Sequence, residues 1–215
     1  MENANISRFE AELSRVNRPG MDALFNYLRS SDMYRAPASG RYHLSVPGGL
    51  VQHSLNVLDV LRGSLKHNAD GTYSMMIAGC EAETVTEENV IVMALLHDIC
   101  KTNFYSASSR NRKNEETGQW EKYLYYEIED KMPLGHGEKS VMMLQEFIKL
   151  DKCEAYAIRW HMGPPEGSDR YSFDQAVDLH PVVWALHSAD MMASHFLEDK
   201  EGNKITPPNT QEALW

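Results

Sequence analysis

Apolar residues recur at helical spacing through most of the chain, and proline and glycine interrupt them. Amphipathic segments over 3–17 and 20–31 are separated by Arg-Pro-Gly, and Val57, Leu61 and Leu65 follow one another at intervals of four. Further helices are predicted from Thr86 to Cys100, over 138–150, over 151–162 and over about 181–198. The pattern therefore predicts a mainly helical protein.

Several of these predicted helices have recognisable ends. Thr86 stands in the N-cap position before two glutamates, and Asp151 with Glu154 resembles a capping box. Gly163, followed by two prolines, ends the helix that begins after Asp151, and Pro181 suits the first position of the last helix. These signals predict separate helices joined by short connections.

Two segments interrupt the helical pattern. Residues 103–133 include "RNRKNEETGQWEKYLYYEIEDKMP", a polar stretch with a central glycine between aromatic and β-branched residues. This composition predicts a β-hairpin or flap around residues 108–130. The segment "GPPEGSDRYSFDQ", which begins at Gly163, is rich in glycine, proline and serine and predicts a loop at the mouth of a cleft.

Length and composition indicate one hydrophobic core. A chain of 215 residues can bury a sizeable core, and a hydrophobic fraction of 42% excludes an intrinsically disordered protein. We expect N-terminal helices over 1–42 that pack on the core, a principal domain over 43–198 that contains the 103–133 insertion, and a polar C-terminal tail over 199–215.

Charge and cysteine content narrow the partners. A formal net charge of −10 argues against a protein held by many phosphates of an extended nucleic acid, because such binders need a basic surface. The three cysteines form no CxxC pair, which favours reduced thiols and a cytoplasmic location. Neither a signal-like N-terminus nor a membrane-spanning apolar run is present in the sequence, so we expect no membrane partner.

Polar residues on the apolar faces of predicted helices form the candidate functional site. His53, His161 and Asp190 each lie on such a face, and "MALLHDICK" places His97 and Asp98 directly after an apolar run. Because burying imidazoles and carboxylates without partners is costly, these residues predict a bound cation. The nitrogen and carboxylate donors suit Mn²⁺, Fe²⁺, Ni²⁺, Zn²⁺ or, less well, Mg²⁺.

Five motifs within residues 43–198 carry a family resemblance: "GGLVQHS", "ALLHDICK", "PLGHGEKS", "RWHMG" and "LHSADMMAS". Their order resembles that of the HD-domain metal-dependent phosphohydrolases, an all-α superfamily. Within it, the chain looks most like the HD domain of bacterial 3′-5′ exoribonucleases and like small phage and bacterial HD hydrolases. The resemblance implies an all-α HD-domain helical bundle with a small hairpin insertion.

The resemblance also implies roles for individual residues. It assigns four residues to a first divalent metal: His53, His97, Asp98 and Asp190. His136 and His161 match the histidines of relatives that hold a second metal, with Asp98 as the bridge. Several of those relatives have adjacent histidines where this chain has Trp160-His161. Asp98 and Lys101 would be catalytic, with Lys101 contacting a substrate phosphate.

These assignments predict a hydrolase that cleaves a phosphoester of a nucleotide or a short oligonucleotide by means of a metal-activated water. In the insertion, basic side chains could grip phosphates and a tyrosine could stack on a base, or the aromatics could simply pack on the helical body. With Lys101, the candidate substrate-binding residues are Arg110, Arg112, Lys113 and Tyr123. The alternatives are a 3′-5′ nuclease that acts with a partner, a non-catalytic nucleotide-binding module, and an inert buried ion network.

Overall fold

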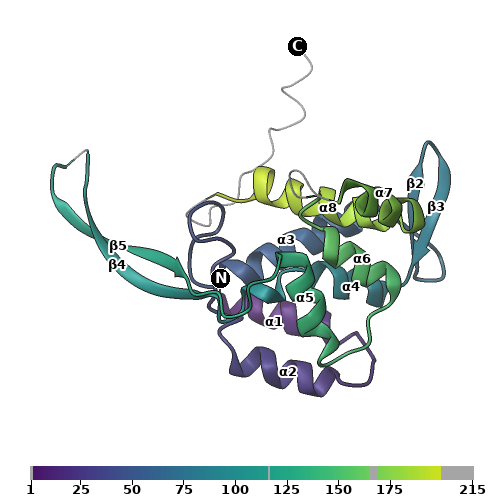
Figure 1. Cartoon of the computed structure of the whole chain (residues 1–215), viewed down its shortest axis with the longest axis horizontal. Helices are drawn as coiled ribbons and strands as arrows, with labels where there is room; N and C mark the ends of the chain where they lie inside the picture. Colours follow the sequence, from purple (N-terminus) through teal and green to yellow (C-terminus); the bar gives the residue numbers. More distant parts are fainter. Residues whose placement is uncertain (1, 116, 165–168, 200–215) are drawn as a thin grey trace, which may run out of the picture.

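The computed structural model describes residues 2–115, 117–164 and 169–199. In this part of the chain eight α-helices form the body of the molecule (Figure 1). They are α1 (Glu2–Leu13), α2 (Met21–Ser30), α3 (Gly49–Ser64), α4 (Glu87–Leu96), α5 (His136–Gln145), α6 (Lys152–Trp160), α7 (Arg170–Leu179) and α8 (Val182–Met192). Two short turns, 3₁₀-helical η1 (Ile99–Lys101) and π-helical η2 (Ala193–Leu197), follow α4 and α8.

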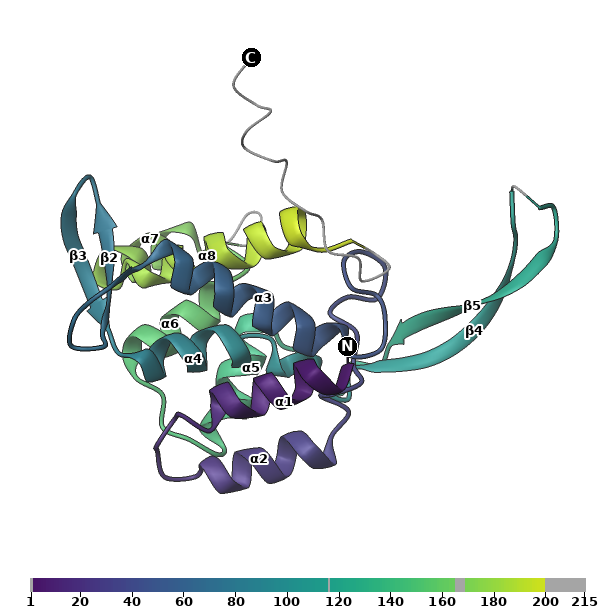
Figure 2. The same ribbon diagram turned by 180° about the vertical axis from the view of Figure 1, so that it is seen from behind.

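Helix α4 lies at the centre of the core. Every residue from Asn89 to Leu96 is buried, as expected for a helix that is apolar on all sides. Its N-terminus is held by a capping box in which Thr86 and Asn89 satisfy each other's backbone amides. Helix α3 packs along α4, and α1 contacts both, with α2 outermost (Figures 1 and 2). The N-terminal helices therefore contribute to the same core as the rest of the body.

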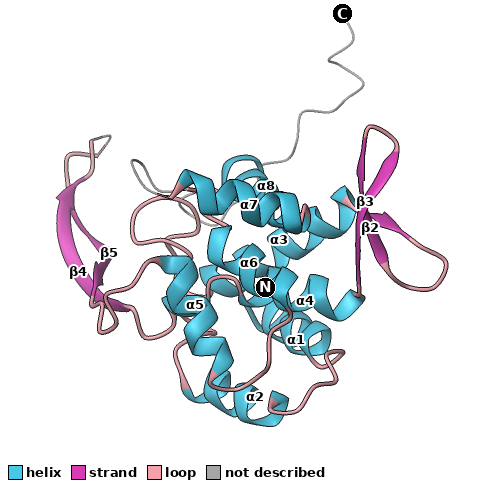
Figure 3. Cartoon of the chain, turned by 45° about the vertical axis from the view of Figure 1, so that its right-hand side comes forward, coloured by secondary structure: helices cyan, strands magenta, loops and turns pink. Residues whose placement is uncertain are grey.

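Two small antiparallel sheets flank the helices, so the chain is a helical bundle but not purely all-α (Figure 3). One sheet, formed by β1 (Lys66–His67), β2 (Tyr73–Ile77) and β3 (Cys80–Val85), lies in a region where the sequence predicted no strands. The β2–β3 turn has two residues with positive φ, Ala78 at 49° and Gly79 at 82°. Tight hairpin turns of this kind usually carry Asn-Gly or Asp-Gly, and an alanine there gives no recognisable signal.

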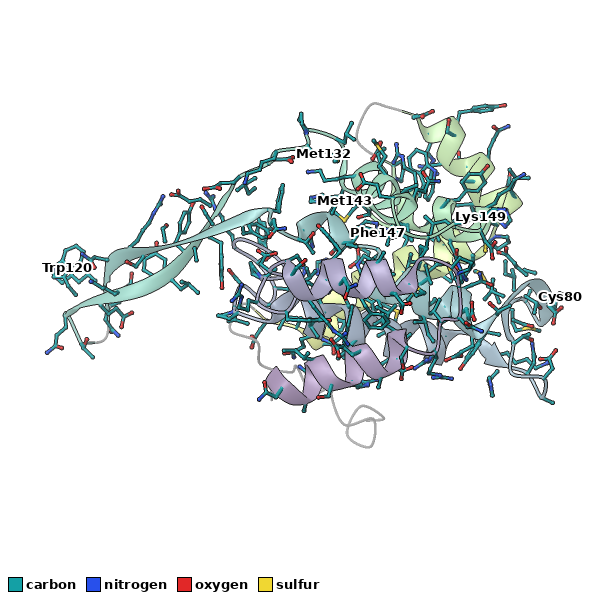
Figure 4. All side chains as sticks on the ribbon, turned by 90° about the horizontal axis from the view of Figure 1, so that it is seen from below. Cys80, Trp120, Met132, Met143, Phe147 and Lys149 are labelled. Carbon is teal, nitrogen blue, oxygen red and sulfur yellow. The ribbon has the colours of Figure 1, made fainter. Side chains whose placement is uncertain are left out.

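The insertion forms the second sheet, a long two-stranded hairpin. Strands β4 (Tyr105–Lys113) and β5 (Trp120–Ile128) pair from Tyr105 opposite Ile128 to Lys113 opposite Trp120. We call this hairpin the arm, because it projects away from the helices (Figure 1). Trp120 lies at its far end, on the opposite side of the molecule from Cys80, and is 73% exposed (Figure 4). The arm agrees with the predicted hairpin or flap and is slightly displaced from its predicted bounds.

Some predicted elements differ from those observed. Helix α7 begins at Arg170, inside the segment predicted as a loop, while residues 165–168 of that segment lie outside the described residues. The predicted helix over 181–198 ends as α8 at Met192 and continues as η2. The predicted tail, apart from residue 199, also lies outside the described residues. The division into 1–42, 43–198 and 199–215 stays a prediction. No helix within the described ranges has the length and hydropathy needed to cross a bilayer.

Candidate metal centre

Four helices deliver five buried ligand-type side chains to one place, which we call the candidate metal centre. His53 comes from the middle of α3, and His97 and Asp98 follow the last residue of α4. His161 follows the last residue of α6, and Asp190 lies in the last turn of α8. All five are buried, although imidazole and carboxylate groups are normally solvated.

The four residues predicted to hold a first metal meet around a common point. His53 Nε2 lies 3.1 Å from Asp190 Oδ1, 3.3 Å from His97 Nε2 and 3.7 Å from Asp98 Oδ2. His97 Nε2 is also 3.4 Å from Asp98 Oδ2. These separations are close to those between neighbouring ligands of one small cation, for which metal–ligand distances are about 2.0–2.2 Å.

Backbone carbonyls fix the orientation of two of the imidazoles. His97 Nδ1 donates to the carbonyl of Ala94 at 2.9 Å, and His161 Nδ1 donates to the carbonyl of Ile158 at 2.7 Å. In both cases the ring satisfies one of the carbonyls left without a partner at a helix C-terminus. Because each Nδ1 carries the hydrogen, each Nε2 presents a lone pair to the candidate metal centre.

Two buried atoms have no hydrogen-bond partner among the described residues and test whether a cation fits. Asp98 Oδ1 and His161 Nε2 lie 3.4 Å apart, and neither makes a hydrogen bond. An acceptor oxygen facing a lone pair at this depth is costly unless a positive charge lies between them. The imidazole and carboxylate donors match the preferences of Mn²⁺, Fe²⁺, Ni²⁺ and Zn²⁺. The residues present therefore fit a divalent metal.

The charges around His53 lead to the same conclusion. Burial lowers the pKa of His53, but Glu198 and Asp190 outweigh burial and raise that pKa to about 10. Burial raises the pKa of Asp98, yet Lys101 and His97 bring it well below its ordinary value. The carboxylates are therefore charged and hold a proton on His53 when no metal is bound. A metal ion would displace that proton, since metal ligation requires the free imidazole nitrogen.

Lys101 is held over Asp98 by the short 3₁₀ turn η1. The Lys101 amide donates to the Asp98 carbonyl at 2.9 Å, and residues three apart eclipse each other in a 3₁₀ helix. Lys101 Nζ consequently lies 2.5 Å from Asp98 Oδ2. Burial lowers the pKa of Lys101, but the effect of the Asp98 carboxylate is larger and raises that pKa above its ordinary value, so the ammonium remains charged. The structure thus places the two predicted catalytic residues in direct contact.

His136, a predicted ligand of the second metal, lies at the edge of this group as the first residue of α5. Its Nδ1 is 3.3 Å from the Cys100 sulfur, and ligand atoms of Asp98, Cys100 and His136 all lie within 4.8 Å of one another. His161 groups with His97 and Asp190, and its Nε2 lies 3.4 Å from Asp98 Oδ1. Both predicted second-metal histidines therefore adjoin Asp98, while the sequence had not marked Cys100 as a neighbour of the site.

Glu198 is a site residue that the sequence did not reveal. Both of its carboxylate oxygens lie 3.1 Å from His53 Nδ1, and Asn56 Nδ2 donates to Oε1 at 2.9 Å. The Glu198 side chain is fully buried. A carboxylate on the outer nitrogen of a ligand histidine orients the ring and increases its basicity. No motif marks Glu198, because its partners are about 140 positions earlier in the sequence.

A cleft of about 1230 Å³ opens above the candidate metal centre, with Asp98, Lys101, His136 and Asp190 among its lining residues. Of the other substrate-binding candidates, Arg110, Lys113 and Tyr123 do not line it. Their strand positions, and that of Arg112, lie farther along the arm. Arg110 lies over the Tyr125 ring at 3.8 Å and forms an ion pair with Glu127 at 3.0 Å. Of the insertion, only the base of the arm reaches the cleft.

A comparison with protein families matches the HD domain over residues 50–195, which is more than half of the chain. The chain belongs to the HD domain family. Members of this family are typically metal-dependent hydrolases, and HD domains bind divalent metals, in agreement with the buried histidine and aspartate clusters. Neither the curated proteins nor the solved structures give a significant match. The narrower resemblance to exoribonucleases and phage hydrolases therefore stays a prediction.

Proposed function

We propose that the protein is a metal-dependent phosphohydrolase that cleaves a phosphoester of a nucleotide or a short oligonucleotide. The observation that carries the proposal is the convergence of His53, His97, Asp98 and Asp190, with unpartnered buried atoms on Asp98 and His161. Asp98 and Asp190, with Lys101 and His136, line the floor of an open cleft, so a phosphate can approach the candidate metal centre there. Membership of the HD domain family supports the same chemistry.

The side chains of the floor suit phosphoryl transfer. His53, His97 and Asp190 would hold the first divalent ion, His161 and His136 would adjoin a second, and Asp98 would contact both. Bound there, such ions supply Lewis acidity and lower the pKa of a water molecule. Lys101 would bind a non-bridging oxygen of the phosphate and offset the charge that develops on it. Because Lys101 is already ordered by Asp98, it needs little rearrangement to do so.

A small phosphorylated substrate agrees with the composition and the site better than an extended nucleic acid does. The chain carries a net charge of −10, and among the described residues that line the cleft only Arg41 and Lys101 are lysine or arginine. Continuous tracking of a nucleic-acid backbone would need many basic groups. The three cysteines are free, which is compatible with the cytoplasmic location that we propose.

An activity screen tests this function. Purified protein with Mn²⁺ should hydrolyse p-nitrophenyl phosphate, bis(p-nitrophenyl) phosphate or members of a nucleotide panel. Asp98→Asn should reduce turnover on the order of 10³-fold, because it removes a charge from a preorganised, water-poor site. Asp59→Asn is the matched control, since Asp59 is exposed, forms an ion pair with Arg8 and does not line the cleft. Equal activity of the two variants, or no hydrolysis by the wild type, would remove the proposal.

The same screen separates the two alternatives. Degradation of labelled RNA or DNA strands from the 3′ end, without hydrolysis of nucleotides, would identify a nuclease that needs a partner. Tight binding of a nucleotide that remains intact after long incubation would identify a binding module.

A further inference from the structure

The cleft above the candidate metal centre has a polar floor and an apolar rim. Tyr42, Met162 and Met191 line the cleft, and Tyr42 is 77% exposed and Met162 58% exposed. Large apolar side chains gathered around a few convergent polar groups are typical of a ligand-binding cleft. A bare phosphate would use only the floor. The rim therefore indicates a ligand with an organic part, and a tyrosine face is suited to a planar ring.

Arg41, the neighbour of Tyr42, adds a positive charge to this rim. Arg41 lines the cleft and is exposed. Its guanidinium donates to the Tyr125 hydroxyl at 3.1 Å and lies 6.0 Å from the centre of that ring. Among the described residues Arg41 forms no ion pair with a carboxylate, in contrast to Arg110, which Glu127 neutralises. Most donors of the Arg41 guanidinium are therefore available to an anion.

The rim and the floor are joined along one wall of the cleft. A Cβ added to Gly40 would lie 3.4 Å from the Tyr105 ring and 3.6 Å from the Tyr126 carbonyl, so the loop that carries Arg41 packs against the base of the arm. Tyr105 lines the same cleft as Lys101 and Arg41. Lys101 at the floor and Arg41 at the rim therefore provide two positive charges along the same wall.

We propose that Arg41 and Tyr42 form a second subsite, in which Arg41 binds a phosphate beyond the one at the floor and Tyr42 stacks on a nucleobase. This inference rests on the proposed function and narrows its substrate class to nucleotides that carry at least two phosphate groups. Nucleoside 5′-di- and triphosphates share that chemistry with 5′-phosphorylated dinucleotides. Tyr125 positions Arg41, and the base of the arm thereby becomes part of substrate recognition.

Binding measurements test the charge and the ring separately. Calorimetry on protein from which metal has been removed by a chelator avoids turnover and leaves Asp98 and Lys101 in place, and the probes are ATP, the dinucleotide pApA, AMP and inorganic tripolyphosphate. Arg41→Met should weaken binding of ATP or pApA by about ten- to a hundredfold and of AMP by clearly less, since a charged hydrogen bond is lost. Tyr42→Ala should weaken all three nucleotides by about tenfold and leave tripolyphosphate unchanged, since only stacking is lost.

Arg35→Met is the matched control, because Arg35 is an exposed arginine six positions earlier that does not line the cleft. It should change none of these affinities. Equal losses for AMP and ATP in Arg41→Met, or losses no larger than in Arg35→Met, would overturn the subsite. Whether ATP or pApA suffers the larger loss tells a triphosphate from an oligonucleotide.

Failure of the subsite and failure of the proposed function give different results. In the active enzyme, kcat/KM is measured for the better substrate with two or more phosphates and for p-nitrophenyl phosphate. Arg41→Met should lower the ratio of the first value to the second at least tenfold, which corresponds to the free energy of the lost charged contact. An unchanged ratio in an enzyme that hydrolyses nucleotides refutes the subsite alone. Selective binding without any hydrolysis refutes the hydrolase alone.

Discussion

The floor and the rim of the cleft are built by different parts of the fold. The candidate metal centre at the floor includes His97 and His161, which lie at helix ends beneath the cleft surface and whose rings are held by backbone carbonyls. Rim residues such as Arg41 and Tyr42 come from a loop that packs against a protruding hairpin. The candidate metal ligands, which tolerate little displacement, thus lie on packed helices. The residues proposed to select the substrate lie on segments that can vary without unfolding the core.

The two regions also differ in their exposure to water. His161 is completely buried, while Tyr42 is 77% exposed. Electrostatic interactions are stronger where water is excluded, and a buried group left without its partner is costly. Changes at the floor should therefore alter stability and metal affinity together, while changes at the rim and arm should alter neither.

Metal removal should have the largest effect on stability. Side chains from α3, α4, α6 and α8 meet at the candidate metal centre, so an ion there would link four helices. An ion present at a hundred times its Kd would add about 2.7 kcal/mol to the free energy of unfolding. Chelation should therefore lower the thermal midpoint, and added Mn²⁺ should restore it, as followed by circular dichroism. An unchanged midpoint after verified removal of the metal would contradict the claim that a bound ion stabilises the helical fold.

Glu198→Gln should have the next largest effect. The change keeps the size of the side chain but removes the charge that orients His53. Loss of such an outer partner typically costs ten- to a hundredfold in metal affinity. Metal titration monitored by calorimetry should show this loss, and Glu129→Gln, at an exposed position, serves as the control. Equal affinities in the two variants would show that Glu198 only fills space beside His53.

The sequence predicted which side chains meet at the candidate metal centre much better than it predicted the residues around them. His53 and Asp190 are recognisable because each interrupts an apolar helical face, and a helix fixes which residues share a face. Glu198 has no such mark, since its role depends on a contact with His53 across 145 positions. Arg41 and Tyr42 lie in an irregular segment whose path is set by packing against the arm, and local pattern does not predict such packing.

The secondary structure, too, was predicted well in some segments and poorly in others. Helices with strong periodicity or a capping box, such as α4 and α6, were predicted close to their observed positions. The sheet around β2 and β3 was missed because Ala78 occupies a left-handed turn position that normally carries asparagine, aspartate or glycine. The start of α7 lies in the predicted loop because the local excess of Gly, Pro and Ser obscured an apolar face formed by Phe173 and Ala176.

A smaller effect is expected for Glu12→Gln, which weakens the body without touching the cleft. Arg62 donates to both carboxylate oxygens of Glu12, at 2.9 and 2.7 Å, and thereby joins α1 to α3. These hydrogen bonds lower the pKa of Glu12 to about 2, from an ordinary value of 4.5. The Glu12 contribution to stability is therefore complete above pH 4.5 and is lost as the pH falls towards 2.

Urea denaturation measures this contribution. At pH 7 the variant should be less stable than the wild type by about 1 kcal/mol, because the pair is partly screened by solvent. The difference should shrink as the pH is lowered from 4.5 towards 2, while metal affinity at pH 7 stays unchanged. A difference that persists undiminished at the lowest pH would mean that Glu12 acts through packing and not through its charge.

Removal of the far half of the arm should have the smallest effect, and it separates the arm's base from its tip. Replacing residues 111–122 with Asn-Gly would close the hairpin just beyond the pair formed by Arg110 and Tyr123. The base that lines the cleft is retained, so the free energy of unfolding should change by no more than about 0.5 kcal/mol. The KM for nucleotides should stay within a factor of about two, a difference of roughly 0.4 kcal/mol. A marked rise in KM would instead assign Arg112 and Lys113 to the substrate, one of the two alternatives that the sequence left open, and would extend the rim along the arm.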